Sequence, residues 1–367
     1  MKINLKSKRK RWNLHQKVFL ILVILVLFLA TINVAKALGW LIPEQPKIKV
    51  EQKTIVLSSL TLEQKIAQMI VVPGQEWSVE PWRKMGLGGI HIYAMKDAQV
   101  FKAMIEKFQQ NMTIPFMVTT DLEGCWTPFG NFKNFTSVSE ILTTEKATEV
   151  GTEEGEFLTE LGFTLDFAPV VDLKDEIWNC RSFPGDEKKI TELAEAYIDG
   201  IQSTGIAATA KHYPGKTLVV KDPHKFVVAA EISAEDVYPF ASISAQNKVK
   251  ALMISHIIAS GAIDTKGKPA VVSTEVISQL KQNYSGLIIS DEINMLGLKK
   301  YYSTMDEVYV MVFAAGNDIV LNFNDDPNEI YHMIQVVKKA VEDKKISEDK
   351  IDSSVKKILE LKGFIVE

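Results

Sequence analysis

Two acidic residues, Asp291 and Glu292, directly follow the apolar run Leu287–Ser290. A carboxylate at the end of a buried strand can act as a nucleophile, for example on the anomeric carbon of a sugar. An Asp that caps the following helix, with Glu292 favoured by the helix dipole, would give the same pattern. The pair is therefore a candidate for covalent catalysis. The residues around it must show whether Asp291 is a nucleophile or a helix cap.

Lys211 and His212 end another apolar run and are followed by the turn residues Pro214 and Gly215. Successive side chains of a strand point to opposite faces, so both can contact one ligand only if the strand ends or bulges there. Lys offers three donors and His a donor or an acceptor, which suits the hydroxyl groups of a sugar. A buried Lys paired with a carboxylate of the fold is the structural alternative.

The segment Asp222-Pro223-His224 follows shortly after this run. An Asp two residues from a His can accept the imidazole N–H, fix the tautomer and raise the pKa of the ring. Such a His could protonate a leaving group near neutral pH. The spacing alone is more typical of a solvated loop, so a catalytic role for this segment depends on context.

Eight short apolar runs alternate with segments of 3.6-residue periodicity, which predicts a parallel sheet covered by helices. Polar residues gather just after these runs, as expected where the strand ends of a barrel converge on an active site. We therefore predict a (β/α)8 barrel of the α/β class; a doubly wound open sheet is the alternative, although no G-x-G-x-x-G follows the first run. The predicted strands are Met69–Val72, Gly89–Tyr93, Phe116–Thr120, Thr164–Pro169, Ala207–His212, Ala251–His256, Leu287–Ser290 and Asp318–Asn322.

The N-terminal segment, residues 1–40, has the order of an export signal. Seven Lys and Arg residues in 1–17 precede an unbroken apolar run, Val18–Ala30. This order predicts a single membrane-spanning anchor with the basic end in the cytoplasm and the remainder outside. Cleavage near Ala37, at the small residues Ala35 and Ala37, would instead release a secreted protein. Residues 41–57 are expected to form a linker and 58–367 the barrel.

Charge and cysteine content narrow the possible partners. Residues 1–40 carry eight basic and no acidic residues, which leaves 34 basic and 46 acidic residues in the rest, a net charge of −12. So acidic a body argues against nucleic acid as a partner. We find no metal-ligand spacing and no phosphate-binding loop, so no cofactor is expected. Nor does the sequence indicate an obligate protein partner.

Cys125 and Cys180 could pair outside the cell, which we treat as a hypothesis.

Several motifs, taken in their order and spacing, resemble glycoside hydrolase family 3, and within it the β-N-acetylglucosaminidases of NagZ type. The resemblance extends from about Leu60 to Asn324, and we expect no second α/β domain. It is carried by Leu60–Lys65, Asp121–Gly124, Asp166–Asp172, Arg181–Phe183, Ala207–Gly215, Asp222–Lys225, Met253–His256 and Ser290–Glu292.

This resemblance implies a retaining exo-glycosidase that removes terminal β-linked N-acetylglucosamine from glycans such as peptidoglycan fragments. Asp291 would be the nucleophile, and His224 with Asp222 would be the acid/base pair. A family 3 β-glucosidase or β-xylosidase, or a silent sugar-binding barrel, are the alternatives. Residues implied to bind the sugar are Asp121, Arg181, Lys211 and His212.

Three departures from the family pattern fall near the implied site. Gly124-Cys125-Trp126 stands where Gly-Gly-Arg is common, which removes one sugar-binding Arg. Lys216-Thr217 replaces His-Gly, and Pro223 replaces Ser in the Asp-x-His segment. Trp126 and Trp178 lie beside the implied pocket loops, where we expect them either to stack on sugars or to pack against the protein.

Overall fold

The computed structural model describes residues 14–37, 41–219, 221–222 and 225–367, so Pro223 and His224 lie outside the described residues. Eight parallel strands form one sheet in the order β10-β8-β6-β5-β4-β3-β2-β11. The sheet closes on itself, because Ser290 N donates to Ile319 O (2.9 Å) and Ile289 forms a parallel bridge with Ile319. Its strands are β2 Ile70–Pro73, β3 Gly89–His91, β4 Met117–Thr120, β5 Leu165–Asp166, β6 Ala207–Tyr213, β8 Ala251–Ile254, β10 Leu287–Ser290 and β11 Val320–Leu321.

The predicted (β/α)8 barrel is confirmed, and each of the eight predicted runs overlaps one of these strands. The largest difference is β5, which has two residues where the sequence predicted Thr164–Pro169. Pro169 lacks an N–H and cannot donate to a strand ladder, so regular pairing ends early on that strand.

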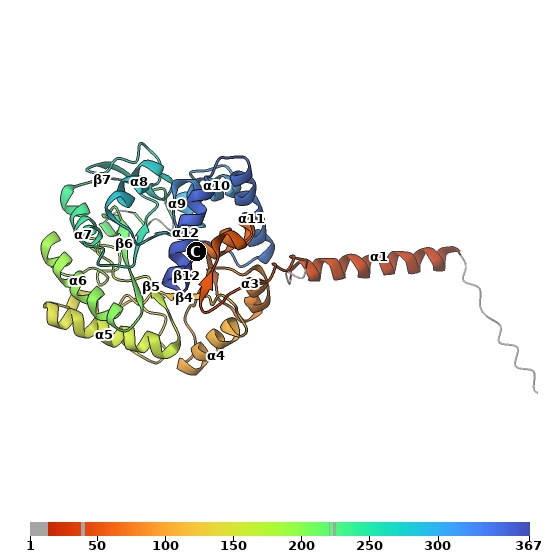
Figure 1. Ribbon diagram of the computed structural model, residues 1–367, viewed down its shortest axis with the longest axis horizontal. Helices are drawn as coiled ribbons and strands as arrows, with labels where there is room; N and C mark the ends of the chain where they lie inside the picture. Colours follow the sequence, from red (N-terminus) through yellow and green to blue (C-terminus); the bar gives the residue numbers. More distant parts are fainter. Residues whose placement is uncertain (1–13, 38–40, 220, 223–224) are drawn as a thin grey trace, which may run out of the picture.

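Helices surround the barrel as an outer ring (Figure 1). Most begin at a side-chain cap, such as Thr143 before α5 and Thr304 before α10, and both of these helices end at a glycine with positive φ. Their apolar faces pack on the strands and bury a continuous core. The helices are α2 Leu62–Gln68, α3 Val79–Met85, α4 Ala98–Gln109, α5 Thr144–Leu161, α6 Glu187–Ser203, α7 Ala234–Ala245, α8 Thr274–Asn283, α9 Leu296–Lys299, α10 Met305–Ala315, α11 Pro327–Glu342 and α12 Glu348–Leu361.

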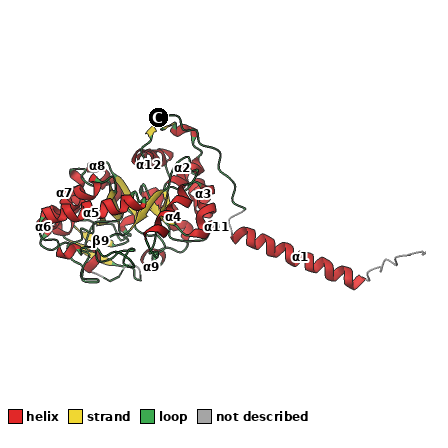
Figure 2. Cartoon of the chain, turned by 90° about the horizontal axis from the view of Figure 1, so that it is seen from below, coloured by secondary structure: helices red, strands yellow, loops and turns green. Residues whose placement is uncertain are grey.

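A second, two-stranded parallel sheet extends the barrel at the end where the strands finish. It pairs β7 Ala229–Ile232 with β9 Ile258–Gly261 and encloses a small apolar cluster of its own. Figure 2 shows β9 on the side of the molecule opposite the C-terminus. The sheet anchors the far end of the loop that leaves β6, in which Asp222 lies.

The N-terminal helix α1, Leu14–Ala37, extends away from the barrel (Figures 1 and 2). Its segment Leu14–Ile32 is long and apolar enough to cross a membrane, and none of it is buried against the protein. The chain then returns to β1, Thr54–Ile55, which pairs in parallel with β12, Ile365–Val366. The last residues of the predicted linker are therefore part of a small sheet that joins the two ends of the barrel domain.

Candidate active site

A cavity of about 320 Å³ lies at the carboxyl ends of the barrel strands, where the sequence placed its candidate residues. Its volume is at the low end of the range for small-molecule sites, roughly 300–1,000 Å³. Such a cavity suits one compact polar ligand. The lining residues used below are Asp121, Glu123, Trp126, Phe167, Trp178, Arg181, Lys211, His212, Asp291 and Glu292.

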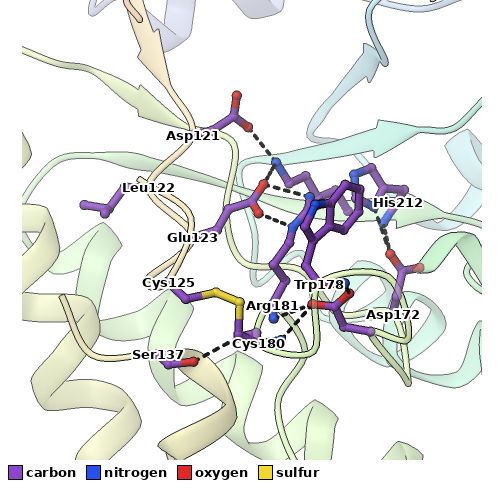
Figure 3. A network of polar contacts seen from close by, with 12 residues as sticks. Asp121, Leu122, Glu123, Cys125, Ser137, Asp172, Trp178, Cys180, Arg181 and His212 are labelled. Atoms are coloured by element: carbon purple, nitrogen blue, oxygen red, sulfur yellow. Dashed lines mark hydrogen bonds and ion pairs between the residues drawn. A yellow bond between two sulfur atoms is a disulfide. The ribbon is translucent and has the colours of Figure 1, made fainter. Parts of the chain in front are cut away.

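Four charged side chains form a network on one wall of this cavity, in which Glu123, Arg181 and Lys211 are buried and Asp121 is 30% exposed (Figure 3). Lys211 Nζ donates to Asp121 Oδ1 (2.6 Å) and also contacts Glu123 Oε1. Arg181 Nη2 donates to Glu123 Oε1 (3.0 Å), and its Nε lies against Glu123 Oε2. Two cations thus face two carboxylates with little solvent around them, which is the arrangement that a buried charge requires.

The pKa values in this network show that it holds its charges. Burial alone would lower the pKa of Lys211, but the carboxylates of Asp121 and Glu123 outweigh burial and raise it. Burial would raise the pKa of Asp121, yet Lys211, His91 and Arg181 bring it below its usual value. At neutral pH the wall therefore presents fixed charges and directed hydrogen-bonding groups, which can bind several hydroxyls of one sugar.

His212 is oriented by a carboxylate behind it. Its Nδ1 lies 2.8 Å from Asp172 Oδ2, and its backbone N–H donates to the same oxygen (3.3 Å). With Nδ1 occupied, Nε2 is the ring nitrogen left for a ligand. The register of β6 against β8 shifts between Ala210 and Tyr213, and both Lys211 and His212 line the cavity. The sequence analysis predicted such an irregular strand end, because only then can Lys211 and His212 both contact one ligand.

Asp291 and Glu292 follow β10, and both line the cavity. Glu292 Oε1 accepts from Asn294 N (2.9 Å), Asn294 Nδ2 (2.8 Å) and Phe323 N (3.0 Å), so this carboxylate fixes the loops that follow β10 and β11. Asp291 Oδ1 accepts the adjacent N–H of Glu292 (2.8 Å), and the side chain lines the cavity. Both carboxylates lie at the cavity, and Glu292 also holds the loops beside it.

The disulfide between Cys125 and Cys180, proposed from the sequence, is present in the structure, with Cα atoms 6.1 Å apart. It links the loop after β4, which carries Glu123, to the loop after β5, which carries Arg181 (Figure 3). The second loop is also held by Asp175, whose carboxylate accepts from the backbone N–H groups of Trp178, Cys180 and Arg181 (2.8, 2.9 and 2.7 Å). The charged wall therefore rests on cross-linked loops.

The structure brings together five of the seven predicted site residues: Asp121, Arg181, Lys211, His212 and Asp291 all line the cavity. Asp222 is not among the described lining residues; its Oδ2 lies 3.4 Å from Lys225 Nζ within its own loop. His224 lies outside the described residues. Within the described part of the chain, no cluster of three or more His, Cys, Asp or Glu side chains could hold a metal ion.

Sequence reasoning did not assign roles to Glu123 and Asp172. Glu123 joins Lys211 to Arg181, and Asp172 orients His212. Both follow predicted strands, and this position was the only indication in the sequence that they lie near the active site. The side-chain partners that define their roles lie 40 to 88 residues further along the chain, so spacing could not reveal them.

The chain matches the model of the glycosyl hydrolase family 3 N-terminal domain over residues 61–361. It is 28% identical over 261 residues to a beta-hexosaminidase of Actinobacillus succinogenes, covering 66% of this chain and 74% of the relative. A family 3 beta-N-acetylglucosaminidase of Paenibacillus superposes with a TM-score of 0.75 at 25% identity, covering 83% of this chain and 62% of that one. M tuberculosis LpqI superposes with a TM-score of 0.76 at 23% identity, covering 84% and 95%. This chain belongs to glycosyl hydrolase family 3 and is a glycoside hydrolase.

Proposed function

We propose that this enzyme is a retaining exo-β-N-acetylglucosaminidase whose nucleophile is Asp291. The observation that carries the proposal is the position of Asp291 at the cavity that also contains the buried wall of Asp121, Glu123, Arg181 and Lys211. A terminal sugar bound by that wall would lie against the Asp291 carboxylate. N-acetylglucosamine is the proposed sugar because relatives in Actinobacillus and Paenibacillus bear the names beta-hexosaminidase and beta-N-acetylglucosaminidase.

Within this proposal, Asp121, Arg181, Lys211 and His212 bind the hydroxyls of the terminal sugar and hold its anomeric carbon near Asp291. Charged groups already fixed by one another need little rearrangement when the substrate binds. In the first step, an Asp291 oxygen bonds to the anomeric carbon as the bond to the leaving oxygen breaks. Water then attacks the same carbon and releases Asp291, so the configuration is retained.

We assign the proton transfers to His224, with Asp222 as its partner. Their spacing, Asp-x-His, and the resemblance of this segment to the NagZ branch support the assignment. In the first step His224 gives its proton to the departing glycosidic oxygen, and in the second it takes a proton from water. The rule that relates carboxylate separation to stereochemistry does not apply, because one partner is an imidazole.

We also propose that the enzyme acts outside the cytoplasm on glycans such as peptidoglycan fragments. The apolar helix α1, preceded by a basic segment in residues 1–17, supports a membrane anchor, and a cleaved signal remains the alternative. In this organisation residues 1–40 hold the protein in the membrane, 41–57 connect, and 58–367 carry the catalysis.

Hydrolysis of p-nitrophenyl N-acetyl-β-glucosaminide, compared with p-nitrophenyl β-glucoside, tests the proposal directly. We expect the full chain to prefer the first substrate, Asp291→Ala to lose turnover, and His224→Ala to slow natural disaccharides more than aryl glycosides. A good leaving group needs less protonation, hence the last difference. Preference for the glucoside would reject the assigned sugar, and binding of N-acetylglucosamine without hydrolysis of either substrate would indicate a sugar-binding barrel.

A further inference from the structure

The rim of the cavity carries two tryptophans on neighbouring loops. Trp126 belongs to the loop after β4 and Trp178 to the loop after β5, and both line the cavity. Trp126 is 57% exposed, whereas the aromatic Phe167 of the same lining is 1% exposed. The indole of Trp126 thus presents a large apolar face at the entrance instead of packing into the core.

The backbone holds Trp126 in place although its side chain is exposed. Glu123 N donates to Trp126 O (2.8 Å), which closes a tight turn through Gly124 and Cys125. Gly124 has φ 69°, and a Cβ there would lie 2.4 Å from Thr136 O, so the turn is pressed against the neighbouring segment. A ring on so well fixed a turn loses little entropy when it binds a ligand.

Trp178 is fixed by a different set of contacts. Its backbone N–H donates to Asp175, and the Arg181 guanidinium lies over its ring, 4.4 Å from the centroid. Figure 3 shows this ring beside the charged wall, with the Cys125–Cys180 disulfide below it. The disulfide joins the residue next to Trp126 to the loop of Trp178, so the two tryptophans lie on one covalently linked support.

We infer that Trp126 and Trp178 form the subsite for the second sugar, the one on the leaving-group side of the bond that is cleaved. The inference rests on the proposed function. The cavity of about 320 Å³ is lined by the charged wall and by both tryptophans, so a terminal sugar held by the wall leaves the linked sugar to the tryptophans at the exposed end. The C–H face of a β-linked pyranose is apolar and flat, and it stacks well on an exposed indole.

This subsite lets the enzyme distinguish substrates by their leaving group, which the charged wall does not contact. The wall contacts only the terminal sugar, which is the same in every substrate of an exo-enzyme. Stacking at the rim favours glycosides whose leaving group is a sugar ring over those with a small alkyl group. The ligand class that we assign to the rim is therefore a pyranose in β-linkage to the terminal N-acetylglucosamine.

The test measures binding of two ligands by calorimetry to the full chain in detergent, in an Asp291→Asn background. N-acetylglucosamine reports on the inner cavity, and N,N′-diacetylchitobiose reports on the cavity together with the rim. We expect Trp126→Ala to weaken disaccharide binding roughly tenfold, as for loss of one stacked ring, and monosaccharide binding less than twofold. Trp126→Phe should restore part of the disaccharide affinity.

Trp77→Ala is the matched control, because Trp77 is 44% exposed and is not part of the cavity lining. It should change neither affinity. A Trp126→Ala variant that loses both ligands equally would show that Trp126 shapes the inner cavity, and one that loses neither would show that the ring does not bind sugar; either result overturns the inference. Failure of the Asp291→Asn parent itself to bind N-acetylglucosamine would instead refute the proposed function, and the inference with it.

Discussion

At the scale of single residues, the active-site cavity depends on charges that compensate one another. Glu123 is the central group, because its side chain is 2% exposed and contacts both Lys211 and Arg181. Burying the charges of Glu123, Arg181 and Lys211 is tolerable only while each has its partner. A change at Glu123 should therefore affect stability and sugar binding together, although this residue need not react.

Glu123→Gln removes one negative charge and leaves Lys211 and Arg181 facing only Asp121. We expect the free energy of unfolding to fall by about 3 kcal/mol, since breaking a buried pair leaves an uncompensated charge. Chemical denaturation measures this loss, and kcat/KM should fall at least tenfold in parallel. Glu153→Gln is the control, because the Glu153 carboxylate is 57% exposed in its pair with Lys133. Equal effects of the two variants would contradict the account.

His91 gives a prediction about pH. Burial lowers the pKa of His91 to about 4, with Asp121 opposing and Lys211 adding to the effect. In the unfolded chain the pKa is close to 6.5, so the unfolded state takes up a proton first as the pH falls. Stability that is complete above pH 6.5 is then lost toward pH 4, by about 1.4 kcal/mol per pH unit.

The variant His91→Gln cannot titrate and should lack this part of the acid sensitivity. Between pH 6.5 and 5 we expect the free energy of unfolding of the unchanged protein to fall by about 2 kcal/mol more than that of the variant. Denaturation at the two pH values measures the difference. His332→Gln, at a half-exposed His on α11, is the matched His-to-Gln control. Parallel curves for His91→Gln and the unchanged protein would refute a neutral, buried His91.

At the scale of elements, the active site is assembled from loops after β4, β5, β6 and β10, each fixed to a neighbour. The disulfide joins the first two of these loops, and Glu292 binds the loops that follow β10 and β11. The barrel supplies the positions of the strand ends, and these cross-connections supply the orientation of the side chains.

Removal of the disulfide by the double change Cys125→Ala, Cys180→Ala should lower the free energy of unfolding. The bond spans 55 residues, for which the loop-entropy relation gives about 4 kcal/mol. Thermal melting with and without a reducing agent measures the effect. The reducing agent should lower the melting temperature of the unchanged protein and leave the double variant unaffected. No effect on the unchanged protein would mean that the two loops are held mainly by other contacts.

The sequence predicted the strands and helices well, because both depend on local periodicity. Helices α5 and α10, for example, begin at a Thr cap and end at a glycine, and such caps and apolar spacing are local features. The strand-end rule also predicted Asp121, Lys211 and Asp291 at one cavity. It could not show that Glu123 bridges two cations, or that Glu292 also binds the loops that follow β10 and β11. Those distinctions arise from contacts between distant segments.

At the scale of the whole molecule, a catalytic barrel is joined to a helix of a different physical character. Helix α1 exposes a continuous apolar surface along Leu14–Ile32, whereas the apolar residues of the barrel are mostly buried. Such a surface is costly in water and stable in a bilayer. We propose that α1 holds the barrel close to the membrane without contributing to the active site.

Deletion of residues 1–40 should therefore move the protein from the membrane to the soluble fraction and leave kcat/KM unchanged within twofold. Fractionation of expressing cells followed by assay of both fractions measures this. The matched control keeps the helix and replaces the basic residues Lys8–Arg11 by Ser, which should disturb orientation while leaving membrane association intact. If expression of the full-length sequence gave a soluble protein with a new N-terminus near Ala37, a cleaved signal would be favoured.

The most direct test of the account is to trap the covalent intermediate with a slow fluorinated N-acetylglucosaminyl donor and to locate the label by peptide mass spectrometry. We predict one sugar per protein, attached to the peptide that contains Asp291, and no label in Asp291→Asn. Stable labelling at another residue would contradict the assigned nucleophile. Steady hydrolysis of p-nitrophenyl N-acetyl-β-glucosaminide without any trapped sugar would contradict covalent catalysis and indicate attack by the substrate's own acetamido group.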